Sequence, residues 1–354
     1  MSVAPTSQGG ARLLLYAMYD ASVLGSAPRV RIGMLSDALA REVRLERIDG
    51  GRWQRLAQFP RIIRQLSRVD AVYVESATAA AMPWDLLALA VARAMGRPVG
   101  VYFRDAYQLF RDLYPVTGLR QRLSDATWRV TMKALRRLAS VRFAPSAGLA
   151  AALQLEGAVL LPPGTDPAAP DLGAGAAPLI GYVGALNPAD GFDRLVEAMS
   201  LVCAEVPEAR LRVIGPPLPP GRHLPDWIEL RPGARDDLAS LLADVRACVI
   251  PRPINRYTDL ARPVKVADYI SFGKPVIATA TAETSALLEP TGAGLLVGDE
   301  PAAIAEGLLR VLRDDALAAG LATAARALAM APGSTWGDRA ALIVNRLVVP
   351  VSRA

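Results

Sequence analysis

Short apolar runs alternate with longer segments of helical periodicity along the whole chain, and this alternation constrains the fold more than any other feature. Runs of this kind that are bounded by turn residues are typical of buried strands. Such strands, when helices separate them, indicate parallel sheets that are covered on both faces. The pattern therefore predicts an α/β protein with two doubly wound domains. The runs lie at residues 13–18, 71–75, 99–103, 141–145 and 158–162, and then at 179–183, 211–214, 247–251, 275–279 and 294–297.

A segment rich in proline, alanine and glycine separates the two sets of runs. Residues 167–178 read PAAPDLGAGAAP and show no periodicity, which is typical of a linker. We therefore expect an N-terminal domain over residues 1–170 and a C-terminal domain over residues 178–334. The last segment, 335–354, is expected to form a helix that packs back on the N-terminal domain.

Composition excludes several kinds of site. The chain has 354 residues but only two cysteines and one histidine, so a disulfide scaffold and multi-histidine metal sites are excluded. The single histidine, His223, follows a Pro-Pro-Gly turn and is expected in a surface loop. No apolar segment reaches the roughly 18 residues that a membrane-spanning helix needs, and the N-terminus lacks the pattern of a signal peptide. We expect a cytoplasmic protein that needs no metal and no cofactor.

Positive charge is concentrated in the first half, which suggests an anionic partner there. Residues 1–177 carry 22 basic and 14 acidic side chains, whereas residues 178–354 carry 18 and 20. A predicted helix at 60–69 carries arginines on one face. A second helix is predicted at 119–138, with an apolar stripe and a separate basic stripe. The apolar stripe is Leu119, Leu123, Ala126, Val130, Ala134 and Leu138, and the basic stripe is Arg122, Arg129, Lys133 and Arg136.

The two basic helices have two interpretations. Each basic face is either an ordinary solvated surface or a site that docks on an anionic membrane surface or a lipid-linked phosphate. In the second case the protein would be peripheral to the inner face of the membrane. Nucleic acid is not expected as a partner, because aromatic residues are not interleaved with the basic ones.

Residues 251–279 hold the densest signal for chemistry. A helix is predicted to begin near Pro263 and to end at Gly273, with Lys265 and Asp268 on one face. A lysine in a first helical turn opposes the helix dipole, but it is explained if it binds a phosphate at that N-terminus. The nearby carboxylate can accept hydrogen bonds from ribose hydroxyls. The alternative is a local Lys–Asp ion pair at the surface.

The same segment resembles the nucleotide-sugar signature of the GT-B glycosyltransferases of family 4. That signature reads Pro-x-Lys-x-x-Glu-Tyr, a short helix, and Gly-Lys/Arg-Pro-Val, and residues 263–277 read PVKVADYISFGKPVI. Further resemblance covers the second half of the chain well, and the first half in pattern only. The other similar segments are 180–186, 191–193, 211–216, 292–297 and 334–336, together with 24–28 and 161–166.

The resemblance implies two Rossmann-like domains that face a cleft, the GT-B fold. A UDP- or GDP-sugar would bind the second domain, and a glycan, lipid-linked or small-molecule acceptor would bind the first. Transfer would retain anomeric configuration without a metal ion. By the same resemblance, Lys265 would hold the diphosphate and Asp268 the ribose, while Gly184 and Gly25 would let their loops approach the nucleotide sugar.

The chain departs from the family pattern at three places. The ribose acid is an aspartate instead of the usual glutamate. Ala185 and Asp190 stand where many relatives have an arginine and a lysine, and the usual upstream acid is replaced by Leu260. Arg252 follows the strand at 247–251 and is the first candidate to compensate for the lost positive charge. Arg256 and Arg262 are alternatives.

Asp105 is the candidate catalytic residue on the acceptor side. It follows the run at 99–103, and the residues that face ligands in open α/β sheets come from the carboxyl ends of strands. A carboxylate there can accept the proton of the attacking hydroxyl, although an aspartate after a strand can instead cap a helix. Tyr19 and Asp20, after the first run, are weaker candidates. Two other functions remain open, namely a nucleotide-sugar epimerase on the same fold and a non-catalytic nucleotide-binding relative.

Overall fold

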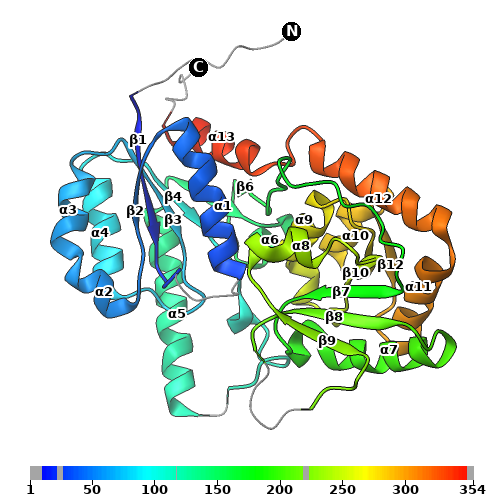
Figure 1. Ribbon diagram of the computed structural model, residues 1–354. Helices are drawn as coiled ribbons and strands as arrows, with labels where there is room; N and C mark the ends of the chain where they lie inside the picture. Colours follow the sequence, from blue (N-terminus) through cyan, green and yellow to red (C-terminus); the bar gives the residue numbers. More distant parts are fainter. Residues whose placement is uncertain (1–9, 22–26, 117, 218–222, 349–354) are drawn as a thin grey trace. The chain divides into compact units, whose positions relative to one another are not determined.

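The computed structural model describes residues 10–21, 27–116, 118–217 and 223–348, and it divides the chain into two compact units (Figure 1). The N-terminal unit contains residues up to 23, 32–162 and those from 336 on, and the C-terminal unit contains 24–31 and 163–335. Each unit is built on one parallel sheet of six strands with helices packed against it. The α/β fold with two doubly wound units is therefore as the sequence predicts.

The N-terminal sheet has the strand order β2-β1-β3-β4-β5-β6. Its central strands are buried over their whole length, as their apolar sequences require. Its strands are β1 (Arg12–Ala17), β2 (Arg44–Ile48), β3 (Ala71–Glu75), β4 (Val99–Tyr102), β5 (Val141–Ala144) and β6 (Val159–Leu160). Its helices are α1 (Ala27–Glu42), α2 (Arg52–Ala57), α3 (Phe59–Leu66), α4 (Pro83–Ala94), α5 (Leu119–Leu138), α6 (Ala147–Ala152) and α13 (Trp336–Leu347), with a short 3-10 turn η1 (Tyr107–Leu109).

Helix α13, from the end of the chain, completes the core of the N-terminal unit. Trp336 and Ile343 lie in the same buried cluster as Leu13 and Tyr73 from the sheet. Gly100 in β4 makes room for this helix, because a Cβ atom at that position would lie 2.7 Å from Cδ1 of Leu347. The N-terminal fold therefore depends on residues at both ends of the chain.

The C-terminal sheet has the strand order β12-β11-β10-β7-β8-β9. This order reverses between β7 and β10, and ligands of open α/β sheets bind outside the carboxyl ends of strands at such a switch point. Its strands are β7 (Leu179–Val183), β8 (Arg210–Gly215), β9 (Ile228–Pro232), β10 (Ala247–Ile250), β11 (Val276–Thr279) and β12 (Gly294–Val297). Its helices are α7 (Phe192–Glu205), α8 (Leu238–Leu241), α9 (Val264–Ser271), α10 (Ala282–Leu288), α11 (Pro301–Arg313) and α12 (Asp315–Met330), with 3-10 turns η2 (Pro188–Asp190), η3 (Arg235–Asp237) and η4 (Thr258–Leu260).

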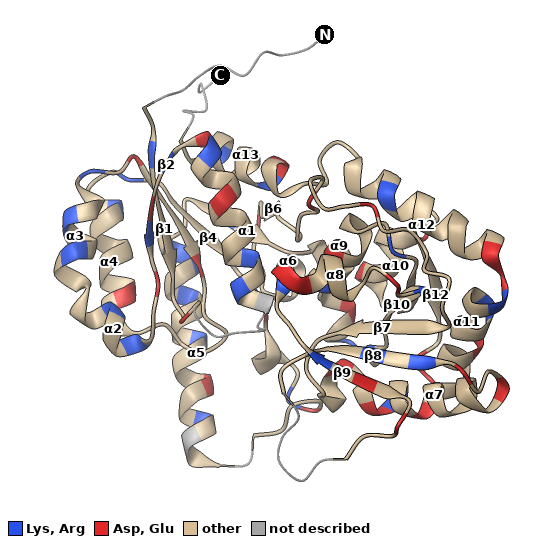
Figure 2. Ribbon diagram, in the orientation of Figure 1, with Lys and Arg blue, Asp and Glu red and all other residues tan. Residues whose placement is uncertain are grey.

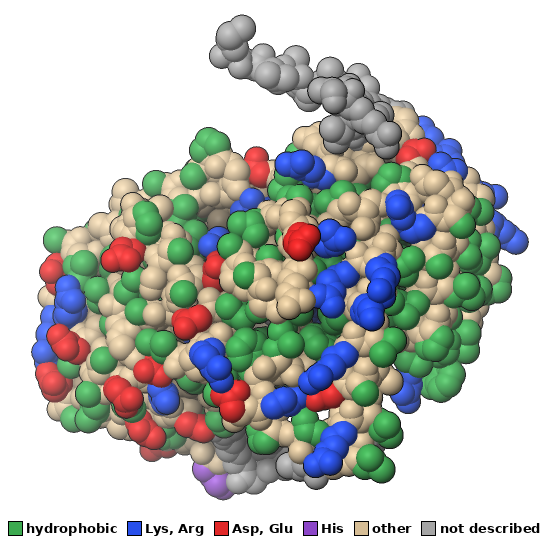
Figure 3. Space-filling model, turned by 180° about the vertical axis from the view of Figure 1, so that it is seen from behind, with side chains coloured by type: hydrophobic (Ala, Val, Ile, Leu, Met, Phe, Trp, Pro, Cys, Tyr) green, Lys and Arg blue, Asp and Glu red, His purple; other side chains and the backbone are tan. Residues whose placement is uncertain are grey.

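Helix α5 has the predicted bounds but buries a different face from the predicted one. Its buried side chains include Trp128, Met132 and Leu135. The predicted apolar stripe instead faces solvent from Leu119, which is 74% exposed, to Val130, which is 67% exposed. The prediction was wrong because the helix packs on the N-terminal unit through Trp128 and Met132, and not through its longest aliphatic repeat. Figure 2 shows basic residues along α5 and α3, and Figure 3 shows basic side chains among exposed hydrophobic ones on one face of the molecule.

The segment predicted as a linker is held along the C-terminal unit. Leu172 donates a backbone hydrogen bond to the carbonyl of Phe272 (2.9 Å), and Gly175 donates one to the carbonyl of Val245 (3.0 Å). These bonds, with the assignment of residues 163–335 to one unit, place the segment with the C-terminal sheet. Across the described parts of the chain, no helix combines the length and the apolar character that crossing a lipid bilayer would require.

Candidate functional site

The switch point of the C-terminal sheet brings two loops together. Strand β7 ends at Val183 and β10 ends at Ile250, and the two strands are parallel neighbours. The residues that follow them, Gly184 and Arg252, therefore emerge at the same edge of the sheet. This edge is where the order of strands predicts a ligand, and both residues were candidates from the sequence.

Gly184 leaves space for Lys265. Its backbone has φ +148°, which side-chain-bearing residues rarely adopt, and a Cβ atom there would lie 2.7 Å from Nζ of Lys265. The lysine belongs to the first turn of α9, for which Pro263 is the N-cap. The ammonium group and the N-terminus of α9 thus meet the bare backbone that follows β7.

An aromatic ring and neighbouring charges hold the ammonium group of Lys265 at this edge. Its Nζ lies 4.7 Å from the ring centre of Tyr182, within the range of a cation–π interaction. Burial lowers the pKa of Lys265, the nearby Asp190 opposes that effect, and Arg252 adds to it. A phosphate at this position would stabilise the charged lysine, because it would replace the hydration that burial removes.

The loop that carries Asp190 is fixed against the loop that carries Arg252. Gly191 has φ +83°, and a Cβ atom there would lie only 1.6 Å from the carbonyl oxygen of Pro251. The Nε atom of Arg252 is buried and has no hydrogen-bond partner among the described residues. The arrangement therefore places two cations and one carboxylate around the end of β10, and one buried guanidinium nitrogen is available to a ligand oxygen.

The ribose candidate, Asp268, is paired with Arg235 and not with Lys265. Its Oδ1 accepts from Nε of Arg235 at 3.1 Å, and Nη2 of Arg235 donates to Asp166 at 3.1 Å. No ion pair joins Lys265 to Asp268 among the described residues, so the alternative of a local Lys–Asp pair is not what forms. Burial raises the pKa of Asp268 to about 6, against the lowering effect of Arg235, and Asp166 raises it further.

The remaining basic candidates have other surroundings. Arg256 is exposed. Arg262 donates to Glu283 at 3.0 Å. Lys274, the other lysine of the 263–277 segment, is fully buried and donates to the carbonyl of Val245 at 2.7 Å, which indicates a structural role. His223 is exposed, as expected, and Gly25 lies outside the described residues.

Asp105 lies at the carboxyl edge of the N-terminal sheet, three residues after the end of β4. Its Oδ2 accepts from the hydroxyl of Thr78 at 2.9 Å and lies 3.5 Å from Nε of Arg104. Burial raises the pKa of Asp105, and Arg104 and Thr78 lower it. The N-cap of the η1 turn is Ala106, so Asp105 does not cap a helix. A raised pKa and an interaction with one hydroxyl suit a general base.

Sequence reasoning missed Tyr182 and Arg235. Tyr182 is fully buried, and its hydroxyl donates to the carbonyl of Ala185 at 3.0 Å. Arg235 follows the carboxyl end of β9, and that position was the signal that could have identified it. Among the described residues, no three histidine, cysteine, aspartate or glutamate side chains form a group that could hold a metal ion.

Comparison with known proteins identifies a family match for much of the C-terminal unit and structures of similar fold. Residues 177–314 match the family model "Glycosyl transferases group 1". Curated protein sequences include no match to the chain. WaaG, a glycosyltransferase involved in lipopolysaccharide biosynthesis, is similar in structure with a TM-score of 0.68 and 15% identity, over 95% of this chain and 100% of that chain.

Two further solved structures share the fold. HepE of Anabaena, in complex with UDP and glucose, has a TM-score of 0.67 and 16% identity, over 95% of this chain and 99% of that chain. A structure described as a UDP-N-acetylglucosamine 2-epimerase from Listeria monocytogenes has a TM-score of 0.54 and 14% identity, over 95% of each chain. The chain therefore has the two-domain fold of the GT-B glycosyltransferases, and its residues 177–314 match the glycosyl transferases of group 1.

Proposed function

We propose that this protein transfers a sugar from a UDP- or GDP-sugar to a hydroxyl group of a glycan, a lipid-linked or a small-molecule acceptor. The proposed reaction retains anomeric configuration and uses no metal ion. The observation that carries the proposal is the meeting of Lys265, Arg252 and the N-terminus of α9 at the switch point, beside the bare backbone of Gly184. All three are suited to bind the negative charge that a departing nucleoside diphosphate develops.

The donor would be oriented from both ends of its nucleotide. Lys265 and Arg252 would hold the diphosphate, and Asp268, one turn further along α9, would accept from the ribose hydroxyls. Arg235 already occupies Oδ1 of Asp268, so the ribose would use the second carboxylate oxygen or displace the arginine. Catalysis would come mainly from positioning and from stabilisation of the leaving group.

The acceptor would be activated at the N-terminal sheet. Asp105 would accept the proton of the attacking hydroxyl, and its raised pKa makes it a stronger base than an exposed aspartate. Thr78 and Arg104, which contact Oδ2, would orient the carboxylate.

The exposed stripe of α5 supports peripheral contact with an anionic membrane. Leu119, Leu123 and Val130 are exposed on a helix whose other exposed positions include Arg129 and Lys133. Exposed leucines beside basic residues are the side chains that amphipathic helices use to bind at the interface of an anionic membrane. Sedimentation with anionic and neutral vesicles would test this contact. Binding to anionic vesicles that is lost in Leu123→Glu supports it, and equal recovery with both vesicle types contradicts it.

Titration calorimetry with UDP and GDP, followed by an assay of donor turnover with and without acceptors, tests the main proposal. A sugar transferred to an acceptor supports it. An epimerised nucleotide sugar formed without acceptor would instead favour the epimerase, which the Listeria neighbour keeps open. Nucleotide binding without turnover of any donor would favour a non-catalytic role, for which the carboxylate of Asp190 beside the two cations is the supporting observation.

A further inference from the structure

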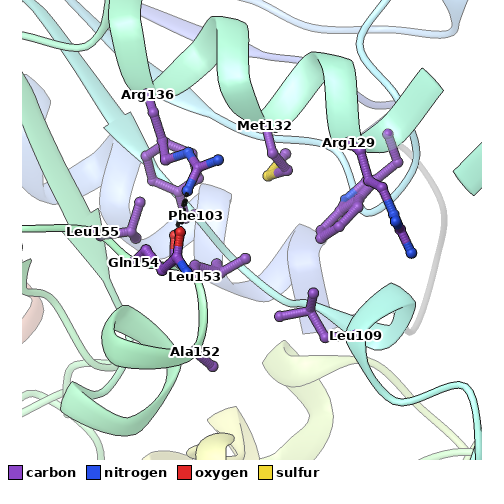
Figure 4. Close-up of a pocket in the computed structure, with 10 residues that line it drawn as sticks. Phe103, Leu109, Arg129, Met132, Arg136, Ala152, Leu153, Gln154 and Leu155 are labelled. Atoms are coloured by element: carbon purple, nitrogen blue, oxygen red, sulfur yellow. Dashed lines mark hydrogen bonds between the residues drawn. The ribbon is translucent and has the colours of Figure 1, made fainter. Parts of the chain in front are cut away.

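A cavity of about 350 Å³ lies inside the N-terminal unit, between α5 and the turn that follows α6 (Figure 4). Its volume is within the range of roughly 300–1,000 Å³ that is typical of small-molecule sites. Seven of its ten lining side chains are apolar, and none is acidic. They are Phe103, Leu109, Trp128, Met132, Ala152, Leu153 and Leu155, and the other three are Arg129, Arg136 and Gln154.

This lining suits a hydrocarbon and not a sugar. A sugar that entered the cavity would leave most of its hydroxyl groups against apolar side chains, at a cost of about 1–3 kcal/mol for each unsatisfied group. A hydrocarbon chain would instead gain from the removal of its surface from water. The cavity therefore favours an apolar chain as its occupant.

Two arginines of α5 add a site for a negative charge beside the apolar space. Arg129 and Arg136 lie on either side of Met132 along the helix, and both line the cavity (Figure 4). Arg136 is fixed by a hydrogen bond from Nη1 to the carbonyl of Leu153 at 3.1 Å. Arg129 is exposed and also lines a second cavity, together with Arg111 and Arg122. An anionic group at the opening would therefore meet at least one guanidinium that can reach it.

Trp128 provides an independent indication of a ligand. Its side chain is 97% buried, since only 3% of its surface is exposed, and it lines the cavity. Its indole Nε1 has no hydrogen-bond partner among the described residues. Buried indole N–H groups usually find an acceptor, and a ligand oxygen in this cavity would supply one.

We infer that this cavity binds the hydrocarbon chain of an amphiphile whose phosphate group is held by Arg129. The chain would pack against Phe103, Met132 and Leu155, and the phosphate would stay at the arginine-lined opening. Lipid phosphates would then be the acceptor class of the proposed transferase. This assignment as an acceptor rests on the proposed function, whereas the binding of the amphiphile does not.

Octyl phosphate, 1-octanol and inorganic phosphate test the site by titration calorimetry without any sugar nucleotide. We expect octyl phosphate to bind, and 1-octanol to bind about tenfold more weakly, because it lacks the charge-assisted hydrogen bonds. Inorganic phosphate should show no detectable binding. Absence of octyl phosphate binding, or equal affinity for inorganic phosphate, would overturn the inference.

Matched variants locate the binding. Ala152→Phe fills the cavity and should weaken octyl phosphate at least about tenfold, whereas Ala151→Phe, at the exposed neighbouring position, should not. Arg129→Gln should weaken octyl phosphate about three- to tenfold without changing 1-octanol, while Arg137→Gln changes neither. Unchanged affinity in both Ala152→Phe and Arg129→Gln would contradict the site.

A third pair of variants tests the site independently, in case Ala152→Phe fails to fold. Leu109→Asp places a carboxylate at a lining position that is 44% exposed, and Leu113→Asp does the same at a position outside the lining that is 37% exposed. Only the first should repel octyl phosphate, and equal effects would count against the inference. Binding without sugar transfer would leave the site standing and remove only its role as an acceptor site.

Discussion

The ammonium nitrogen of Lys265 lies 4.7 Å from the centre of the Tyr182 ring, so a helix residue is held over the end of the first strand of the C-terminal sheet. The ring fixes the lysine before a ligand arrives, and the cation retains its capacity to donate hydrogen bonds. The contact therefore positions the positive charge that a leaving diphosphate would interact with.

Lys265→Ala should lower the transfer rate at least about tenfold, because one charge-assisted hydrogen bond contributes roughly 1.5–3 kcal/mol. Rates are measured with the donor identified by nucleotide titration. Arg310→Ala, which removes an exposed cation of α11, is the control and should retain the wild-type rate. An unchanged rate in Lys265→Ala would refute the role of this lysine.

Asp190→Asn should raise the affinity for a nucleoside diphosphate about three- to tenfold, because it removes a negative charge beside Lys265 and Arg252. Titration calorimetry measures the change. Asp236→Asn, at an exposed position in η3, serves as the control. Weaker binding by Asp190→Asn would show that this carboxylate contributes to the ligand site instead of competing with the ligand.

Nucleotide affinity should fall as the pH drops below about 6, the pKa of Asp268, because a protonated carboxyl group accepts hydrogen bonds from ribose poorly. Titration with UDP between pH 5 and 8, a range that brackets the pKa of Asp268 at about 6, measures this loss. In Asp268→Asn the affinity should be low and should lack this step. A profile that is the same in both proteins would exclude Asp268 from the nucleotide site.

The free energy of unfolding should depend on the ionisation of Asp268 in the opposite direction, so that it falls as the pH rises. The pKa of Asp268 in the folded state is above its ordinary value of 3.8, so the folded protein binds this proton more tightly than the unfolded chain. Its contribution to the free energy of unfolding is therefore fully present below the ordinary pKa and is lost as the pH rises through about 6. Urea unfolding of wild type and Asp268→Asn at several pH values isolates this contribution.

Gly184→Ala should both destabilise the protein and reduce transfer. The alanine would have to adopt φ +148°, and its Cβ atom would lie 2.7 Å from Nζ of Lys265. The expected loss in the free energy of unfolding is about 1–3 kcal/mol. Thermal unfolding and the transfer assay measure the two effects. Gly320→Ala is the control, since a Cβ atom there meets nothing within 4 Å and alanine favours the helix. Equal behaviour of the two variants would contradict the close approach at Gly184.

Asp105→Asn should lower the transfer rate about a hundredfold, as loss of a general base does, and should leave nucleotide affinity unchanged. Asp37→Asn, on an exposed position of α1, should retain both activity and binding. Full activity in Asp105→Asn would assign the proton to another acceptor. Loss of nucleotide binding would also count against a role confined to the acceptor.

The fold was predictable wherever strands are buried on both faces. The apolar run at 71–75 coincides with β3, and that at 179–183 coincides with β7. The edge strands β2 and β9 were missed, because Arg44–Ile48 and Ile228–Pro232 contain charged residues and are partly exposed. Edge strands carry such residues to avoid pairing with other chains, and this removes the apolar signal.

The candidate site was predictable where one residue follows a strand or begins a helix. Lys265, Gly184 and Arg252 have such positions, and the structure places all three at one edge of the sheet. The pairing of Arg235 with Asp268 was not predictable, because 33 residues separate the two side chains along the chain. Asp190 was seen only as a missing positive charge, and its proximity to Lys265 and Arg252 needed the folded chain.

The guanidinium of Arg235 bridges Asp166, three residues into the C-terminal unit, and Asp268 on α9. A nucleotide that hydrogen-bonds to Asp268 would compete with Arg235 for the same carboxylate. Its binding would therefore change how strongly Arg235 interacts with Asp166 at the start of this unit. If the donor binds at Asp268 as proposed, its binding and the anchoring of that segment would be thermodynamically linked, and each would change the other by the same free energy.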